Sequence, residues 1–437
     1  MRKTESISEK LFRNAKWLLG GKTLSGVFAA LEVVILARML GVNDYGVMVL
    51  VVAYVDIVDN IFDFRVWETA TKYISGYLAD DDDEKVLSVI KLSYLINIVS
   101  GILAFSIILV TAKMAENYFI RSDNAYYFIY IYGFSMLFNT ANYTSDAILR
   151  IFDKFKSIAF ITAFYNFFKL AAVITVLSLG MGISEVLMSY AAASFLSLAI
   201  RLVLVSKTLD ERGLGDWWRA RITLIKYKYR EMGWFLGNTS IAGTLRMVND
   251  EYLGMLLLGY WSGKDAAAYY KVAKSFVKLM LRIEDPLYET IYPELVKFSQ
   301  RGAYGELRNI IVFALRKLMK LAVPLVLIVL FLASFIVGAV FGPEYLQAVN
   351  AMRVVTVAGL ISLLIFWVNP VLLSFGKPGI RNIIDVTTSI SFIILLYLLV
   401  PDYSYMGAAV AFLCSILIRV MASTYALKAS INRSIIV

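Results

Sequence analysis

The sequence has no histidine, one cysteine and seven prolines, and only 17% of its 437 residues are charged. Without histidine, the chain can form no Ser-His-Asp or Cys-His catalytic arrangement, no histidine-bearing zinc site and no imidazole proton relay. Cys414 lies in an apolar run and is interpreted as a small buried hydrophobe. A single cysteine forms neither an intrachain disulfide nor a Cys₄ metal site. We therefore expect no catalytic residues, no metal site and no cofactor.

Apolar residues are present in excess. They make up 59% of the chain, and the mean hydropathy is +0.70. A soluble domain averages about 45–50% apolar and about 25% charged residues. Because the buried fraction of a soluble fold rises only slowly with chain length, such a fold could not bury this excess. The composition predicts an all-α polytopic membrane protein.

A helix needs about 20 largely apolar residues to cross the hydrocarbon core. We expect about twelve transmembrane helices, at residues 17–37, 46–64, 86–112, 126–149, 157–179, 184–206, 232–259, 266–290, 310–340, 346–375, 381–400 and 405–427. Apolar character begins only at Trp17, and no small-residue cleavage site follows a short apolar core. No cleaved signal peptide is therefore expected.

The net charge of +10 reflects topology. Thirty lysine and arginine residues lie on one side, in the termini and connections 1–16, 65–85, 150–157, 201–231, 292–320, 376–381 and 419–437. Four lie on the other side, in 38–46, 113–125 and 260–265. The positive-inside rule then places both termini in the cytoplasm of a multi-pass cell-membrane protein. Because topology accounts for the basic balance, we expect no nucleic-acid partner.

A connecting segment at 207–231 divides the chain into six-helix bundles at 1–206 and 232–437. Trp17-Leu18-Leu19-Gly20 is similar to Trp234-Phe235-Leu236-Gly237 at an offset of 217 residues. Both copies would enter from the cytoplasm, so we expect a pseudo-twofold axis along the membrane normal, with the substrate site between the bundles.

The connecting segment mixes aromatic and basic residues between Asp216 and Arg230. This pattern is typical of a segment that lies in the membrane interface on anionic headgroups. The alternative is capture of a lipid headgroup before transport. The acidic run Asp80–Glu84 is interpreted as a solvated loop or as the N-terminal cap of the third predicted helix.

The eighth predicted helix carries four cations on a single stripe, at spacings of 3, 7 and 11 residues: Lys271, Lys274, Lys278 and Arg282. A charge at the bilayer centre costs about 2.5–3.5 kcal/mol. The stripe is therefore predicted to face a wet cavity or acidic partners. In the alternative, Lys271 and Arg282 snorkel to opposite interfaces and the others form structural ion pairs.

The second predicted helix carries the opposite stripe, formed by Asp56, Asp59 and Asp63. These carboxylates either neutralise the basic stripe or bind a coupling sodium ion or proton, with Asp56 the deepest. Arg246 and Asp250, four residues apart, form either a local ion pair or a cavity-facing arginine oriented by Asp250. A cavity lined by lysine and arginine suits an anionic ligand such as phosphate or pyrophosphate.

Several motifs resemble those of the polysaccharide and O-antigen flippases. Leu40-Gly41-Val42-Asn43-Asp44-Tyr45-Gly46 is similar to their L-G-x-x-[DE]-[FY]-G signature. Residues 250–273, Phe341-Gly342-Pro343-Glu344-Tyr345 and Gly376-Lys377 resemble further family segments in matching order. The repeat counterpart of the first motif, Leu258-Gly259…Ala267, departs from it by a longer spacing and has alanine instead of glycine at its last position.

This resemblance implies a carrier of the multidrug/oligosaccharidyl-lipid/polysaccharide exporter superfamily, with two bundles that rock around a central cavity. It further implies ion-coupled transfer of a lipid-(pyro)phosphate-linked oligosaccharide from the cytoplasmic to the outer leaflet. The first alternative is a multidrug or cation antiporter, which would favour an acidic cavity. The second, a membrane glycan polymerase or ligase, is disfavoured because the longest external loop, 113–125, is short.

Overall fold

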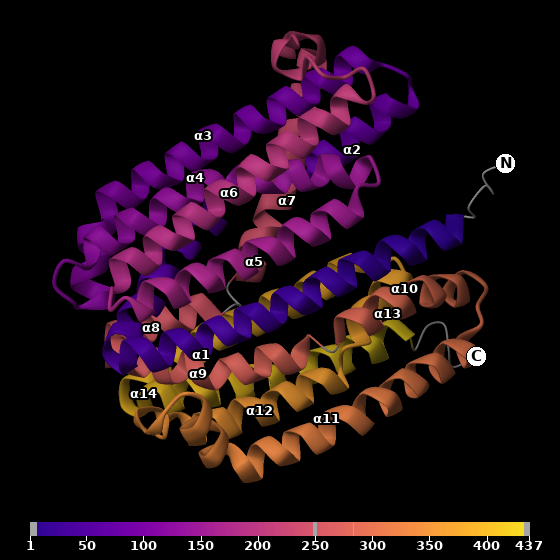
Figure 1. Ribbon diagram of the computed structural model, residues 1–437. Helices are drawn as coiled ribbons and strands as arrows, with labels where there is room; N and C mark the ends of the chain where they lie inside the picture. Colours follow the sequence, from indigo (N-terminus) through magenta and orange to yellow (C-terminus); the bar gives the residue numbers. More distant parts are fainter. Residues whose placement is uncertain (1–6, 248–250, 283, 432–437) are drawn as a thin grey trace. The chain divides into compact units, whose positions relative to one another are not determined.

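The computed structural model describes residues 7–247, 251–282 and 284–431, and every regular element within those ranges is helical (Figure 1). The α-helices are α1 Ile7–Phe62, α2 Val66–Ala79, α3 Asp83–Ala115, α4 Ala125–Ile151, α5 Phe155–Ser178, α6 Ile183–Asp210, α7 Tyr229–Met247, α8 Glu251–Ser262, α9 Lys264–Leu281, α10 Glu284–Gln300, α11 Tyr304–Val340, α12 Ala348–Leu364, α13 Val368–Ser374 and α14 Pro378–Ile431. Short helical turns are η1 Glu116–Ile120, η2 Trp217–Arg219, η3 Ile222–Lys228 and η4 Pro343–Tyr345.

Nine of the twelve predicted apolar stretches each fall on one helix, and three divide between two helices, the tenth stretch between α12 and α13. The first two are joined in α1 across a kink at Gly41, and the last two are joined in α14 across a kink at Ser404. The seventh divides between α7 and α8, and the eighth between α9 and α10. Within the described residues, seven helical segments are long and apolar enough to cross a membrane. A polytopic helical membrane fold is therefore confirmed.

The two glycines of the Leu40–Gly46 motif have different structural roles. Gly41 has φ 73° and ψ 175°, a conformation that residues with a Cβ rarely adopt, and it sets the kink in α1. A Cβ on Gly46 would lie 2.4 Å from the carbonyl oxygen of Lys264, so only glycine allows α1 to approach α9 this closely. Between them, Tyr45 is buried and packs edge-on against Tyr345 at 6.4 Å.

Helix α2 lies where a charged connection at 65–85 was expected. It forms because one face carries the apolar side chains Ala70, Tyr73, Ile74 and Tyr77 at helical spacing, and these are buried against α3 and α4. At the start of α3, the side chain of Asp82 accepts a hydrogen bond from the backbone N–H of Lys85 at 3.1 Å. The predicted N-terminal cap from the acidic run is therefore confirmed.

The chain forms two compact units. The N-terminal unit contains Met1–Glu32, Tyr54–Asn117 and Ser122–Thr244, and the C-terminal unit contains Val33–Ala53, Tyr118–Arg121 and Leu245–Val437. In the N-terminal unit, α4 packs against α3 and α6 around a core that includes Ile148. In the C-terminal unit, α12 packs against α9, α11 and α14, with Leu363 in its core. The predicted repeat and its symmetry axis stay predictions.

Candidate functional site

Helix α9 carries the predicted basic stripe, and burial differs along it. The side chain of Lys274 is buried with 9% exposure, whereas Lys271 is half-buried. Lys278 is exposed, as is Arg282, the C-terminal cap residue of α9. A lysine this deeply buried needs a polar or aromatic environment, because an isolated buried ammonium group is strongly destabilising.

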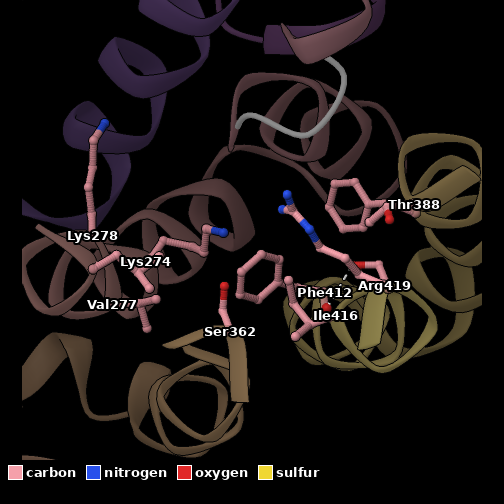
Figure 2. A pocket seen from close by; sticks show the side chains of 11 residues that line it. Lys274, Val277, Lys278, Ser362, Thr388, Phe412, Ile416 and Arg419 are labelled. Atoms are coloured by element: carbon pink, nitrogen blue, oxygen red, sulfur yellow. Dashed lines mark hydrogen bonds between the residues drawn. The ribbon is translucent and has the colours of Figure 1, made fainter. Parts of the chain in front are cut away.

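That environment is a cavity of 240 Å³ within the C-terminal unit, enclosed by α9, α12 and α14 (Figure 2). Its lining consists of Lys274, Val277, Lys278, Leu281, Ser362, Thr388, Phe392, Phe412, Ser415, Ile416 and Arg419. Of the four predicted stripe residues, Lys274 and Lys278 line this cavity, and Lys271 and Arg282 lie outside its lining. The cavity therefore combines three cations with hydroxyl groups and two aromatic rings.

Lys274 lies over an aromatic ring of α14. Its Nζ atom is 3.3 Å from the centroid of Phe412. Figure 2 shows this ammonium group and the Arg419 guanidinium reaching toward the same space, whereas Lys278 extends away from the Phe412 ring. A cation held against a ring face in a desolvated site gains about 2 kcal/mol, which offsets part of the cost of burying Lys274.

Arg419 lines the cavity from within α14, which corrects its predicted place in the C-terminal connection 419–437. It lies within α14, and its NH2 group is 3.0 Å from Oδ1 of Asp385. Arg381 approaches the other oxygen of Asp385 at 3.7 Å. Asp385 therefore orients Arg419 while neutralising only part of the local positive charge. Asp385 and Arg419 are each a charged residue within an apolar run, and this is the sequence signal that could have identified them.

The acidic stripe lies in the N-terminal unit. Asp56 accepts a hydrogen bond from the Tyr132 hydroxyl at 3.1 Å, and its backbone carbonyl accepts one from Asn60 at 2.7 Å. Asp56, Asp59 and Asp63 are all half-buried. Within the described part of the chain, no group of three or more acidic or cysteine side chains is arranged to hold a metal ion. These carboxylates can supply oxygen ligands to a cation or accept protons.

A second group of charged side chains in this unit joins α1 and α5. Lys169 on α5 forms an ion pair with Glu32 on α1 at 2.9 Å, with 15% and 5% of the two side chains exposed. The Tyr190 hydroxyl donates to Glu32, and the Tyr190 ring lies 4.6 Å from the Lys169 ammonium. Glu32 is the sole carboxylate of the first apolar stretch, and that isolation is the sequence signal that could have identified it.

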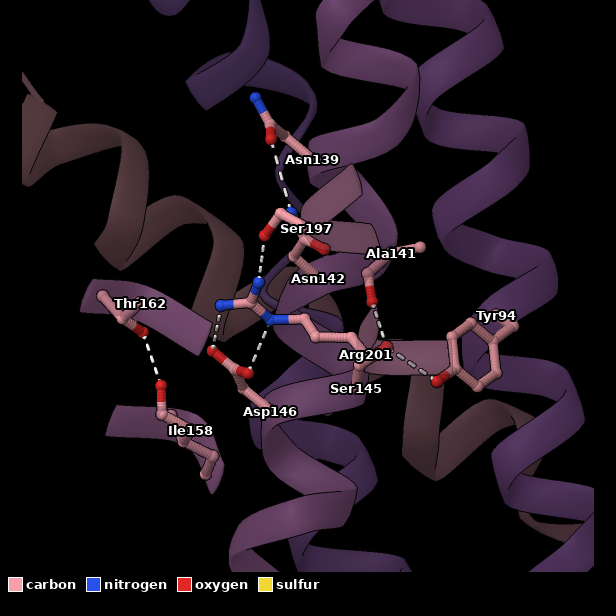
Figure 3. Close-up of polar contacts among 10 residues, drawn as sticks. All are labelled: Tyr94, Asn139, Ala141, Asn142, Ser145, Asp146, Ile158, Thr162, Ser197 and Arg201. Carbon is pink, nitrogen blue, oxygen red and sulfur yellow. Dashed lines mark hydrogen bonds and ion pairs between the residues drawn. The ribbon is translucent and has the colours of Figure 1, made fainter. Parts of the chain in front are cut away.

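A third buried ion pair joins α4 and α6 (Figure 3). Nε of Arg201 is 2.8 Å from Oδ1 of Asp146, and the guanidinium also donates to Ser197. The Arg201 side chain is 7% exposed. This position corrects the assignment of Arg201 to the basic connection 201–231. Because both partners are satisfied within the helix interface, we interpret this pair as structural.

The remaining predicted site residues are Arg246 and Asp250. Asp250 lies outside the described residues, as does the side chain of Arg246, which is the penultimate residue of α7. Their predicted ion pair and their predicted cavity-facing role both stay predictions.

Comparisons with known proteins agree with this architecture. A family model described as "Polysaccharide biosynthesis protein" matches residues 35–350. The chain is 20% identical over 343 residues to the inner membrane protein YghQ of Escherichia coli strain K12, covering 77% of this chain and 94% of YghQ.

Two solved structures show the same fold. The lipid II flippase MurJ in an inward-closed conformation has a TM-score of 0.74 at 16% identity, over 93% of this chain and 86% of that one. An inward-facing multidrug resistance transporter of the MATE family, in the MOP superfamily, has a TM-score of 0.73 at 12% identity, over 94% and 96%. These neighbours are a flippase and a transporter rather than enzymes. The predicted all-α polytopic membrane fold is confirmed, whereas the cytoplasmic location of both termini stays a prediction.

Proposed function

The chain belongs to the family described as "Polysaccharide biosynthesis protein". From this premise we propose that it is a flippase of the multidrug/oligosaccharidyl-lipid/polysaccharide exporter superfamily that translocates a lipid-(pyro)phosphate-linked oligosaccharide. In this proposal the substrate moves from the cytoplasmic to the outer leaflet by alternating access. The cytoplasmic membrane is the proposed location, supported by the likeness to an inner membrane protein.

The observation that carries the proposal is the basic cavity of the C-terminal unit. Lys274, Lys278 and Arg419 line it together, and Arg419 also pairs with Asp385. Phosphate oxygens accept charge-assisted hydrogen bonds from ammonium and guanidinium groups, and the planar fork of arginine suits bidentate contact. The hydroxyl groups and aromatic rings of the lining suit the adjoining sugar.

The remaining members of the predicted set have supporting roles in this proposal. Lys271, Arg282 and Arg246 are proposed to attract the anionic headgroup on its way to the cavity. Asp56 is the proposed coupling site for a sodium ion or proton, with Asp59 and Asp250 as further candidates. Because the chain has no histidine, proton coupling would run through carboxylates.

The proposal is tested by replacing both cavity lysines. The Lys274→Ala/Lys278→Ala double variant, reconstituted in vesicles, should translocate a lipid-linked glycan at least about tenfold more slowly than wild type. Each lost charge-assisted hydrogen bond is worth about 1.5–3 kcal/mol. Lys317→Ala, an exposed lysine on α11 outside the cavity, is the matched control. Wild-type transport by a folded double variant would show that the cavity does not bind the substrate.

The second candidate function is a multidrug or cation antiporter of the same superfamily. The carboxylates of the N-terminal unit favour it, because cationic drugs bind acidic sites. This function predicts gradient-driven movement of a cationic dye, abolished by Asp56→Asn and unaffected by the lysine double variant. The flippase proposal predicts no dye transport. A glycan polymerase or ligase has no structural feature in its favour among the described residues.

A further inference from the structure

A second cavity lies in the N-terminal unit and plays no part in the proposed transport site. It has a volume of 160 Å³ and lies between α2, α3 and α7. Its lining is Val66, Thr69, Leu92, Ser93, Ile96, Tyr229, Met232, Gly233 and Leu236. Most of these side chains are apolar, so the cavity suits a hydrocarbon chain rather than a hydrated ion.

One polar atom of the lining has no partner. The Thr69 side-chain oxygen is buried and makes no hydrogen bond, although the residue is only 3% exposed. Two residues further along α2, Thr71 makes the usual bond to the carbonyl four residues earlier, at 2.7 Å from Trp67 O. An unsatisfied buried hydroxyl costs about 1–3 kcal/mol. A ligand that brings a hydrogen-bond acceptor into the cavity would remove this cost.

Two lysines lie next to the cavity. Lys72 is one turn along α2 from Thr69, and Lys228 directly precedes α7. Lys72 Nζ lies 4.5 Å from the centroid of Phe235, the neighbour of the lining residue Leu236. Lys72 and Lys228 both approach Glu231, at 3.7 and 3.0 Å. Two ammonium groups thus share one carboxylate, which leaves this edge of the cavity positively charged.

The connecting segment covers the same end of the unit. Its chain is fixed on α3, where Lys91 donates to the carbonyl of Ala220 at 2.9 Å and Ser88 donates to that of Arg221 at 3.0 Å. The segment leaves further basic and aromatic side chains exposed to the surroundings: Trp218, Arg219, Arg221, Lys226 and Tyr227. Such a surface attracts anionic headgroups, as the sequence predicts.

We propose that the α2–α3–α7 cavity binds one acyl chain of an anionic membrane phospholipid, whose headgroup lies against Lys72, Lys228 and the basic connecting segment. The order along the helices fits this ligand. Val66 and Thr69 on α2 line the cavity, and Lys72 follows one turn later. A phospholipid has its charge at one end, its ester carbonyls next to it and its hydrocarbon beyond. A carbonyl at the depth of Thr69 would accept the hydrogen bond that its hydroxyl lacks.

The chain offers a matched pair of variants for a test. Gly233 lines the cavity, and a Cβ built there meets no atom within 4 Å. Gly233→Leu therefore places its Cβ without a clash and adds an isobutyl group to the lining. Gly237, one turn along α7, also has no atom within 4 Å but lies outside the lining. Gly237→Leu is the control, because both changes raise helix propensity equally.

The measurement is native mass spectrometry of the purified full chain titrated with phosphatidylglycerol or phosphatidylcholine. We expect Gly233→Leu to lose roughly tenfold or more in affinity for phosphatidylglycerol, because burying two or three methylene groups is worth at least that much. Gly237→Leu should bind as wild type does. Lys72→Ala should reduce the preference for phosphatidylglycerol over phosphatidylcholine without abolishing binding of either.

Other outcomes would overturn the proposal. Wild-type binding by Gly233→Leu would place the lipid elsewhere, and equal binding of the two lipids would remove the role of the cations. Displacement of phosphatidylglycerol by an undecaprenyl phosphate at equal concentration would instead make the cavity a substrate site. Binding does not require transport, so a failure here is distinguishable from a failure of the proposed function.

Discussion

Glu32 and Lys169 form the most deeply buried ion pair of the N-terminal unit. Their side chains are 5% and 15% exposed, and Tyr190 contacts both of them. A buried pair contributes little net stability because the desolvation of both charges offsets their attraction. Removing one partner is different, since the remaining charge is then buried without compensation.

Lys169→Met should therefore lower the free energy of unfolding by about 3–5 kcal/mol. The double variant Glu32→Gln/Lys169→Met removes both charges and should recover most of that loss. Thermal unfolding in detergent measures both effects, with Lys207→Met, an exposed lysine on α6, as the control. A single variant as stable as the control would mean that the ion pair is not maintained in the membrane protein.

The charged residues of the candidate site could be predicted only in part from the sequence. Lys274 and Lys278 could be identified because they recur at helical spacing on one element, which sequence alone displays. Their sharing a cavity with Phe412 and Arg419 could not be predicted, because these two residues reach it from α14, more than a hundred residues away. Proximity created by tertiary packing leaves no periodic signal in a single sequence.

At the scale of elements, the close approach of α1 to α9 depends on Gly46. A Cβ there would meet the carbonyl oxygen of Lys264 at 2.4 Å and its carbonyl carbon at 2.7 Å. Backbone atoms cannot move aside as a flexible side chain can, so one of the two helices would have to shift.

Gly46→Ala should consequently destabilise the C-terminal unit by about 1–3 kcal/mol, the usual cost of overpacking. Gly20→Ala, also in α1 but with no atom within 4 Å, should leave stability unchanged or raise it slightly. Unfolding midpoints of the purified variants provide the comparison. A Gly46→Ala midpoint equal to that of Gly20→Ala would contradict the close contact.

Most helices could be predicted from apolar runs in the sequence, and the exceptions have identifiable causes. Helix α2 was expected as a connection because Arg65 and the acidic run flank it and Lys72 lies within it. Its buried tyrosines supply an apolar face that a hydropathy window does not register. The merged helices α1 and α14 retain two spans each, because one residue in a non-helical conformation redirects the chain without a loop.

At the scale of the whole molecule, the two units carry opposite chemistry. The half-buried carboxylates Asp56 and Asp59 belong to the N-terminal unit, and the basic cavity around Lys274 belongs to the C-terminal unit. In the proposed function, this division separates the site for the coupling cation from the site for the anionic substrate. An alternating-access carrier can link two such sites if both ligands bias the same conformational equilibrium.

Asp56→Asn tests this link. The amide retains an acceptor for the Tyr132 hydroxyl but loses the charge that would hold a sodium ion or release a proton. We expect transport by this variant in reconstituted vesicles to become independent of an imposed sodium or proton gradient, whichever drives the wild type. Tyr132→Phe is the companion variant: it removes the hydrogen bond and leaves the charge, so gradient dependence should persist. An Asp56→Asn variant that still responds fully to the gradient would assign coupling to another carboxylate, with Asp59 the next to replace.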